Sequence, residues 1–425
     1  MKKISALLLL AVATTLNAQT TDPSPQATLS PAQSSAMRAQ KLIDKDPKNF
    51  EAYNALALAL SRRARETSDV AYYTQAEEAL KRSFAIAPDN FDGARTHVWL
   101  LLGKHEFAAA LEEGKKLNQR MPDDIMVYGF LTDANVELGN YKDAETAAQW
   151  MLDLRPGNLP GLTRAAYLRE LFGDVDGSLE LMNMAYQSTP PSEVEDRAWI
   201  ITQMAHLKLA TGKLADAEGL CQHALQMFPG YHYALANLAK VRIQQKRYDE
   251  AVVLLKQRYH AASHAENLYD LAAALELAGR RDEAHQAFAE FERKSLLETD
   301  RADNSNHELI YYYADHARQP AKALAVAERE YARRHDVFTL DSYAWALHAN
   351  GKDAEARKQI TAALAVGIQD SRMLQHAGEI ALAAGDRVGA EDYLRQSAAL
   401  NSVGSIQAQA ALAQMARTSS RLVTQ

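Results

Sequence analysis

The sequence predicts an all-α protein, a right-handed α-solenoid of about ten helical hairpins with a capping helix at each end. Two observations support this prediction. Prolines recur at a fixed period of 34 residues, at Pro88, Pro122, Pro156 and Pro190. Helix-forming residues such as alanine, leucine and glutamate dominate, and only 19 glycines and 12 prolines interrupt the 425 residues. A fixed period of this length is typical of stacked hairpins that bury their apolar faces against one another.

The N-terminal segment, residues 1–18, is expected to be a signal peptide that is removed from the mature chain. Lys2 and Lys3 precede an apolar stretch from Ile4 to Leu16, which is short for a bilayer span. Ala18 ends a stretch that resembles a cleavage site, and an uncleaved anchor is the alternative. No cysteine directly follows the apolar stretch, so a lipid anchor is not expected. We therefore expect a periplasmic or secreted protein.

The next segments are a linker and the solenoid itself. Residues 19–30 are rich in proline, serine, threonine and glutamine and are expected to be a disordered linker. Ser30 and Pro31 suit the start of a helix, which caps the solenoid that we assign to residues 31–401. Residues 402–425 are expected to form a C-terminal capping helix and tail, with apolar residues at helical spacing on one side and a polar outer face.

One hairpin, from Tyr128 to Pro156, shows the repeating unit most clearly. Two amphipathic helices are joined around Gly139, a residue that suits the left-handed turn at the end of a helix. Ala144 is small where the two helices are expected to cross. Pro156 cannot continue a helix and therefore ends the second one.

The residue types of this unit resemble the pattern of the tetratricopeptide repeat (TPR) family, and the whole chain resembles an exported bacterial protein of that family. The matching residues, in order, are Tyr128, Leu131, Gly139, Tyr141, Ala144, Ala148, Met151 and Pro156. Similar units over roughly residues 50–400 give about ten repeats. The first carries extra residues around 64–70, and the fifth follows an insertion at 191–195. The eighth is the most irregular, because bulky Tyr311 stands where a small residue is usual and Pro320 precedes Ala323 closely.

The charge of the chain bears on the class of partner. The formal net charge is −7, and loss of Lys2 and Lys3 on export would make it more acidic. Nucleic-acid phosphates need a basic surface, so we expect no nucleic acid partner. No later stretch is apolar enough to cross a membrane, so no transmembrane segment is expected after signal cleavage.

No catalytic motif stands out in the sequence. Glycine-rich phosphate loops, zinc-protease motifs, nucleophile elbows and paired-cysteine metal motifs are absent, so we expect a protein that is not an enzyme and needs no cofactor. Cys221 falls at a core position and is expected to be an apolar filler rather than a nucleophile. Arg62, Arg63 and Arg65 are expected to form a solvated helix end, with an anion site as the alternative.

Histidines at two places allow a metal hypothesis. His260 and His264 have the i, i+4 spacing of one helix face, and Asp315, His316 and His348 are expected on inner-face positions of adjacent repeats. Packed or surface histidines are the favoured interpretation. The alternative function is an extracytoplasmic metal or small-solute binding protein that uses these inner-face histidine and aspartate residues.

The resemblance implies that the first helix of each hairpin lines a concave groove. The groove residues that it implies are Trp99, Tyr167, Trp199, His206, Tyr233, Tyr269, Tyr312 and Trp345, together with Phe338 and His348. Tryptophan and tyrosine are favoured anchors for peptides, although aromatic residues at helical spacing also occur in cores. The Lys–Asn pair with which some members of the family hold a C-terminal carboxylate is missing, so that binding mode is not expected.

The expected function is therefore that of a non-enzymatic scaffold or adaptor that binds a partner polypeptide in an aromatic-rich groove. A metal or solute carrier is the second hypothesis and an enzyme the third, because no nucleophile–base pair is evident. The sequence leaves open the identity of the partner, the pathway and the oligomeric state.

Overall fold

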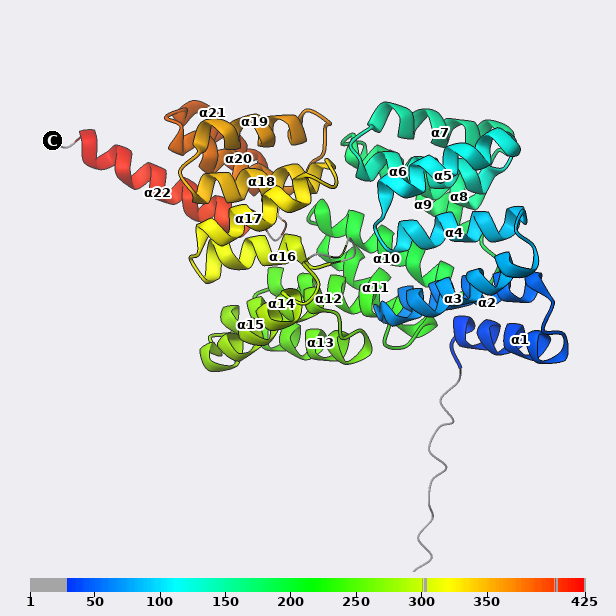
Figure 1. Ribbon diagram of the computed structural model, residues 1–425. Helices are drawn as coiled ribbons and strands as arrows, with labels where there is room; N and C mark the ends of the chain where they lie inside the picture. Colours follow the sequence, from blue (N-terminus) through cyan, green and yellow to red (C-terminus); the bar gives the residue numbers. More distant parts are fainter. Residues whose placement is uncertain (1–28, 300, 302–303, 401, 403, 424–425) are drawn as a thin grey trace, which may run out of the picture. The chain divides into compact units, whose positions relative to one another are not determined.

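The computed structural model describes residues 29–299, 301, 304–400, 402 and 404–423. The expected signal peptide and most of the expected linker lie outside these residues. Within them the regular secondary structure is helical, without a strand, and the helices follow one another as antiparallel pairs (Figure 1). The expectation of an all-α solenoid of ten hairpins with a capping helix at each end is confirmed.

The helices are α1 (Pro31–Lys45), α2 (Phe50–Thr67), α3 (Ala71–Ile86), α4 (Phe91–Gly103), α5 (Phe107–Arg120), α6 (Ile125–Glu137), α7 (Tyr141–Leu154), α8 (Leu159–Leu171), α9 (Val175–Ser188), α10 (Val194–Ala210), α11 (Leu214–Met227), α12 (His232–Gln244), α13 (Tyr248–Ala261), α14 (Ala265–Leu277), α15 (Arg281–Ser295), α16 (Asn306–Tyr311), the π-helix η1 (Tyr312–His316), α17 (Pro320–Tyr331), α18 (Val337–Ala349), α19 (Asp353–Leu364), α20 (Ser371–Ala383), α21 (Arg387–Ala399) and α22 (Ser405–Val423). The hairpins run from α2–α3 to α20–α21, and α1 and α22 stand at the two ends.

The hairpin of α6 and α7 shows why the sequence folds in this way. Asp124 caps α6 by accepting a hydrogen bond from the backbone N–H of Val127 at 3.0 Å. Gly139 has a φ of +77° and turns the chain between the two helices. Ala144 is fully buried where α7 lies against α6, and α7 ends just before Pro156. The roles that the sequence assigned to Gly139, Ala144 and Pro156 are therefore present.

The eighth hairpin differs from the others because its first helix is not a plain α-helix. After the six residues of α16 the chain continues as the π-helix η1, which adds a residue to the turn. Tyr311 and Tyr313 are both buried. Pro320 stands in the first turn of α17, where its missing N–H costs nothing. The irregular sequence of this repeat is therefore accommodated by a local change of helix type.

The solenoid makes contacts between hairpins that are far apart in the sequence. The backbone N–H of His335 donates to the carbonyl oxygen of Glu137 at 3.3 Å, so the α17–α18 connection touches the end of α6. The backbone N–H of Val337 donates to the Tyr141 hydroxyl at 2.9 Å, across 196 residues. A Cβ atom on Gly173 would lie 2.5 Å from the carbonyl oxygen of Gly367, so these two turns also approach closely. We call these contacts the turn closure, because they join successive turns of the solenoid.

Candidate binding site on the inner face

The first part of the site is the long end of α2. This helix has 18 residues, against 13 in α4, so the extra residues of the first repeat lengthen it. Arg65 near its end forms ion pairs with Glu195 and with Asp196, the latter at 2.9 Å. The expectation that this end of α2 is solvated is therefore wrong, because the end is packed against α10.

The start of α12 adds hydrogen bonds to this contact between α2 and α10. The Tyr231 hydroxyl donates to Glu195 at 2.9 Å, and both side chains are buried. His232 Nε2 lies 3.1 Å from the carbonyl oxygen of Arg65, and burial lowers the pKa of His232 to about 4. A neutral imidazole in this position donates through Nε2, because the carbonyl oxygen can only accept. The hydrogen bonds therefore fix α2 to α10 and α12.

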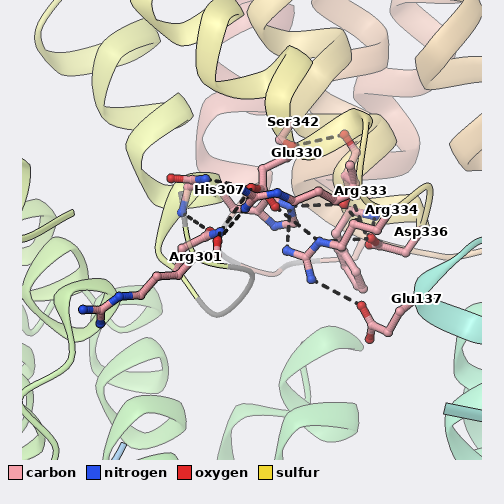
Figure 2. A network of polar contacts seen from close by, with 12 residues as sticks. Glu137, Arg301, His307, Glu330, Arg333, Arg334, Asp336 and Ser342 are labelled. Atoms are coloured by element: carbon pink, nitrogen blue, oxygen red, sulfur yellow. Dashed lines mark hydrogen bonds and ion pairs between the residues drawn. The ribbon is translucent and has the colours of Figure 1, made fainter. Parts of the chain in front are cut away.

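The second part is a polar network at the turn closure (Figure 2). Arg334 lies 3.3 Å from Glu137 on α6 and 3.7 Å from both Glu330 and Asp336 on its own side. Burial is the main cause that raises the pKa of Glu137, to about 7, and the charge of Asp336 acts in the same direction. Three carboxylates therefore lie around the guanidinium of Arg334 at the contact between α6 and the α17–α18 connection.

Two cavities lie between the ends of these helices. The first, which we call the arginine cavity, has a volume of about 370 Å³. Its lining residues are Ser61, Arg62, Ala64, Arg65, Ser68, Asp69, Val70, Tyr73, Trp99, Gly103, His105, Tyr233, His264 and Glu266. The second, which we call the tyrosine cavity, has a volume of about 260 Å³. Its lining residues are Leu102, His105, Phe107, Thr132, Asp133, Val136, Glu137, Arg164 and Tyr167. His105 lines both, so the two cavities adjoin.

The tyrosine cavity is built on an ion pair. Arg164 lies 2.5 Å from Asp133 and also donates to the carbonyl oxygen of Gly129 at 3.0 Å. Burial raises the pKa of Asp133, although the charge of Arg164 acts against this. Burial also raises the pKa of Tyr167, so its hydroxyl stays protonated and can donate a hydrogen bond. The cavity thus offers an aromatic ring beside polar groups of both charges.

Three of the eight groove residues expected from the sequence line these cavities. Trp99 and Tyr233 lie at the arginine cavity and Tyr167 at the tyrosine cavity. Trp199 packs beside the cores of the fourth and fifth hairpins, and His206 lies 2.8 Å from Glu170. The structure therefore brings only part of the expected set together, and the binding roles of all eight remain predictions.

The other three expected groove residues belong to aromatic packing in the C-terminal half. Tyr269 and Trp345 are buried, at 8% and 9% exposure. Tyr312 stacks on Phe288 with ring centroids 5.3 Å apart. Trp345 stacks on His376 at 4.1 Å. These three rings therefore contribute to packing between helices more than to an exposed binding surface.

The residues of the alternative metal hypothesis in adjacent repeats have separate partners. Asp315 accepts a hydrogen bond from Trp345 Nε1 at 2.8 Å. His316 lies 2.9 Å from Glu276, and His348 lies 2.6 Å from Asp353. Across the residues that the structure describes, no three histidine, cysteine, aspartate or glutamate side chains converge as a metal site would require.

Sequence reasoning missed two residues that matter here. His105 has a φ of +60° in the α4–α5 turn, at the position that Gly139 occupies in the α6–α7 turn. A histidine at a place that favours glycine is a signal that could have identified it, because a side chain in a left-handed turn needs a compensating contact. His105 stacks on Phe107 with ring centroids 5.3 Å apart. Arg334 had no comparable signal, because its partner Glu137 is 197 residues away.

Comparison with known proteins supports the repeat assignment. Residues 208–258 match the family model of the tetratricopeptide repeat. This segment runs from the end of α10 into α13, so it includes α11, which is the second helix of the fifth hairpin, and α12 and most of α13, which form the sixth. No curated protein sequence matches the chain. None of the described helices is long and apolar enough to cross a membrane.

Three solved structures are similar to this chain at low sequence identity, and two of them have a TM-score of at least 0.50. The human IFIT1 dimer with m7Gppp-AAAA is 14% identical, with 86% of this chain and 84% of that chain covered and a TM-score of 0.51. A monomeric IFIT1 mutant with Gppp-AAAA is 13% identical, with 87% and 95% covered and a TM-score of 0.50. A thermophilic TPR protein of Thermus thermophilus is 20% identical over 47% of this chain and 99% of its own, with a TM-score of 0.36. The chain is thus an α-solenoid that resembles TPR proteins in sequence and fold.

Proposed function

We propose that this protein is a non-enzymatic scaffold that binds a segment of a partner polypeptide on its inner face. The observation that carries the proposal is the pair of adjoining cavities, which gather Trp99, Tyr167 and Tyr233 between turns of the solenoid. Aromatic side chains in cavities are the common anchors of protein interfaces, because they contribute large contact area with few rotatable bonds. TPR-type solenoids favour such a role, since their stacked helices create long concave surfaces.

The proposal places the scaffold outside the cytoplasm and includes no nucleic acid partner. The positively charged and apolar start of the sequence supports export. The IFIT1 structures contain capped oligonucleotides, but at 14% identity the likeness shows the fold alone. A formal net charge of −7 disfavours phosphate backbones. The partner of this protein is therefore proposed to be a polypeptide.

A capture experiment with matched variants tests this function. The full chain is used to isolate partners from envelope extract, and any captured protein is purified and its binding measured directly. Trp99→Ala/Tyr167→Ala/Tyr233→Ala is expected to weaken this binding at least tenfold, as loss of interface anchors does. Trp150→Ala is the control, because Trp150 is 50% exposed on the second helix of its hairpin, away from both cavities. Equal binding by the triple variant and the wild type would refute an inner-face site.

A further inference from the structure

The arginine cavity contains a cationic side chain whose charge has no partner. Arg62 lines the cavity, its Nε is buried without a hydrogen bond, and no ion pair joins it to any residue that the structure describes. The Nε atoms of Arg63 and Arg65 also lack a hydrogen bond, but both of these side chains form ion pairs through their Nη atoms. Arg63 is bound to Glu66 at 2.8 Å, and Arg65 is bound to Glu195 and Asp196. Arg62 is therefore the guanidinium of this cluster that remains available to an anion.

The two carboxylates at the cavity have other partners. Glu266 lies 3.6 Å from Arg258 and 4.0 Å from His264. Asp69 accepts a hydrogen bond from the backbone N–H of Ala71 at 3.0 Å. Arg62 has no ion pair and lies in a cavity with two carboxylates, which favours a ligand with a single negative charge, because Asp69 and Glu266 would repel a dianion more strongly.

Four side chains with rings form another part of the cavity lining. The rings of Tyr73, Trp99 and Tyr233 and the imidazole of His105 line the same cavity as Arg62. Burial raises the pKa of Tyr233 to about 12, so its hydroxyl is neutral and available as a donor. A volume of about 370 Å³ lies in the range of small-ligand sites, and rings of this kind prefer a flat apolar partner.

We propose that the arginine cavity binds a carboxylate attached to a flat apolar group, with the carboxylate paired to Arg62 and the apolar group between Trp99 and Tyr233. Arginine binds carboxylates well because its planar N–H groups match the two oxygen atoms. Two sources share this chemistry: a free aromatic acid, and a peptide in which an acidic and an aromatic side chain are neighbours. The free acid tests this site without any partner protein, so its outcome is separate from that of the scaffold function.

Binding is measured on the full chain by saturation-transfer NMR and by quenching of tryptophan fluorescence. The probes are 3-phenylpropionate, its uncharged amide 3-phenylpropanamide, the capped peptide acetyl-Gly-Phe-Glu-Gly-amide, and its glutamine counterpart. We expect at least one acid to bind about tenfold more tightly than its uncharged counterpart, because a hydrogen-bonded charge pair is lost in the latter. Binding by the free acid alone identifies a small-molecule site, and binding by the peptide alone identifies a subsite for a partner segment.

Variants at Arg62 show whether its side chain causes the preference for the acid over its uncharged counterpart. Arg62→Gln is expected to abolish the preference for the acid over its uncharged counterpart, and Arg62→Lys is expected to retain part of it. Arg82→Gln is the matched control, because Arg82 is exposed on α3 and does not line the cavity. The comparison of acid and amide on the wild type keeps the test valid if Arg62→Gln does not fold.

Three results would overturn the proposal. The first is equal binding of acids and uncharged counterparts by the wild type. The second is an unchanged preference in folded Arg62→Gln. The third is tighter binding of adenosine monophosphate than of either acid, since this would make a phosphate dianion the preferred ligand.

Discussion

At the scale of single residues, the crossing of two helices depends on the size of one side chain. Ala144 is fully buried between α6 and α7. Replacement of Ala144 by leucine adds volume to a closely packed contact and is expected to destabilise the protein by about 1–3 kcal/mol. Urea denaturation followed by circular dichroism measures this loss. Glu145→Leu is the control on the exposed side of α7, and an equal effect of both variants would contradict the assigned register.

The single cysteine reports on opening of the fifth hairpin. Cys221 is fully buried, and burial raises the pKa of its thiol to about 12. Because the thiolate is the reactive form, we expect no reaction with Ellman's reagent near pH 8 in the native protein and complete reaction after unfolding in guanidinium. Rapid labelling of the native chain would show that Cys221 is exposed, and Cys221→Ala gives the background of the assay.

The pH dependence of stability follows from buried glutamates. Burial raises the pKa of Glu137 and of Glu308 from 4.5 to about 7. Carboxyl groups with raised pKa values bind protons more tightly in the folded chain. They therefore stabilise it fully below pH 4.5, and this contribution is lost as the pH rises through 7. His232 and His307, whose pKa values burial lowers to about 4, act only below pH 6.5.

The test uses the interval from about pH 6.5 to about pH 8.5, in which the glutamates dominate. The urea midpoint of the wild type is expected to fall over this interval, and that of Glu137→Gln is expected to fall less. Glu145→Gln, at an exposed position, should follow the wild type. If the urea midpoints of Glu137→Gln and the wild type depend on pH in the same way, protonation of Glu137 does not contribute to stability in this interval.

At the scale of elements, the turn between α6 and α7 has a second role besides joining the hairpin. A Cβ atom on Gly139 would lie 2.7 Å from the carbonyl oxygen of His335, whereas a Cβ atom on Gly279 would meet nothing within 4 Å. Both glycines have nearly the same φ, +77° and +74°. Replacement by alanine strains the backbone similarly at both positions. The two variants therefore differ only in the contact across the turn closure.

This pair of glycines yields a stability prediction. Gly279→Ala should cost about 1 kcal/mol, because a side chain in the left-handed region is strained. Gly139→Ala should cost more than this, because the backbone of His335 must also move. The difference between the two urea midpoints measures the turn closure, and a difference of zero would show that the contact contributes nothing to stability.

The hairpins could be predicted from the sequence because their contacts are local. Gly139, Ala144 and Pro156 all act within one unit, and the period of 34 residues repeats the unit along the chain. The turn closure could not be predicted, since it depends on small rotations summed over many hairpins. The same limit applies to the groove residues: Tyr167 and Trp345 occupy similar repeat positions, yet one lines a cavity and the other is buried.

At the scale of the whole molecule, the turn closure adds contacts that a simple solenoid lacks. Stability in a repeat array is usually a sum over repeats and their neighbours. Here Arg334, at the turn closure, forms an ion pair with Glu137, and Arg65, at the end of α2, forms one with Asp196. Both ion pairs join hairpins that are far apart in the sequence, so distant hairpins also stabilise one another. We expect these contacts to keep the two cavities closed on the side where the turns meet.

Small-angle X-ray scattering tests this coupling. The double variant Gly139→Ala/Gly173→Ala places Cβ atoms against the backbones of His335 and Gly367, and it is expected to have a larger radius of gyration than the wild type. Gly279→Ala/Gly385→Ala is the control, because neither of these positions has a neighbour within 4 Å. Equal radii of gyration for both double variants would show that the spacing of the turns does not depend on the contacts at Gly139 and Gly173.

The contact between Gly139 and His335 also limits how such a protein can change in length during evolution. Repeat arrays grow and shrink by duplication or loss of whole units. A unit gained or lost between residues 139 and 335 would displace one partner by a full hairpin, so Arg334 would no longer face Glu137. Units added before α1 or after α22 would leave this pairing unchanged. We therefore expect natural variants of this array to differ in repeat number at the ends and to keep the interval between these two positions constant.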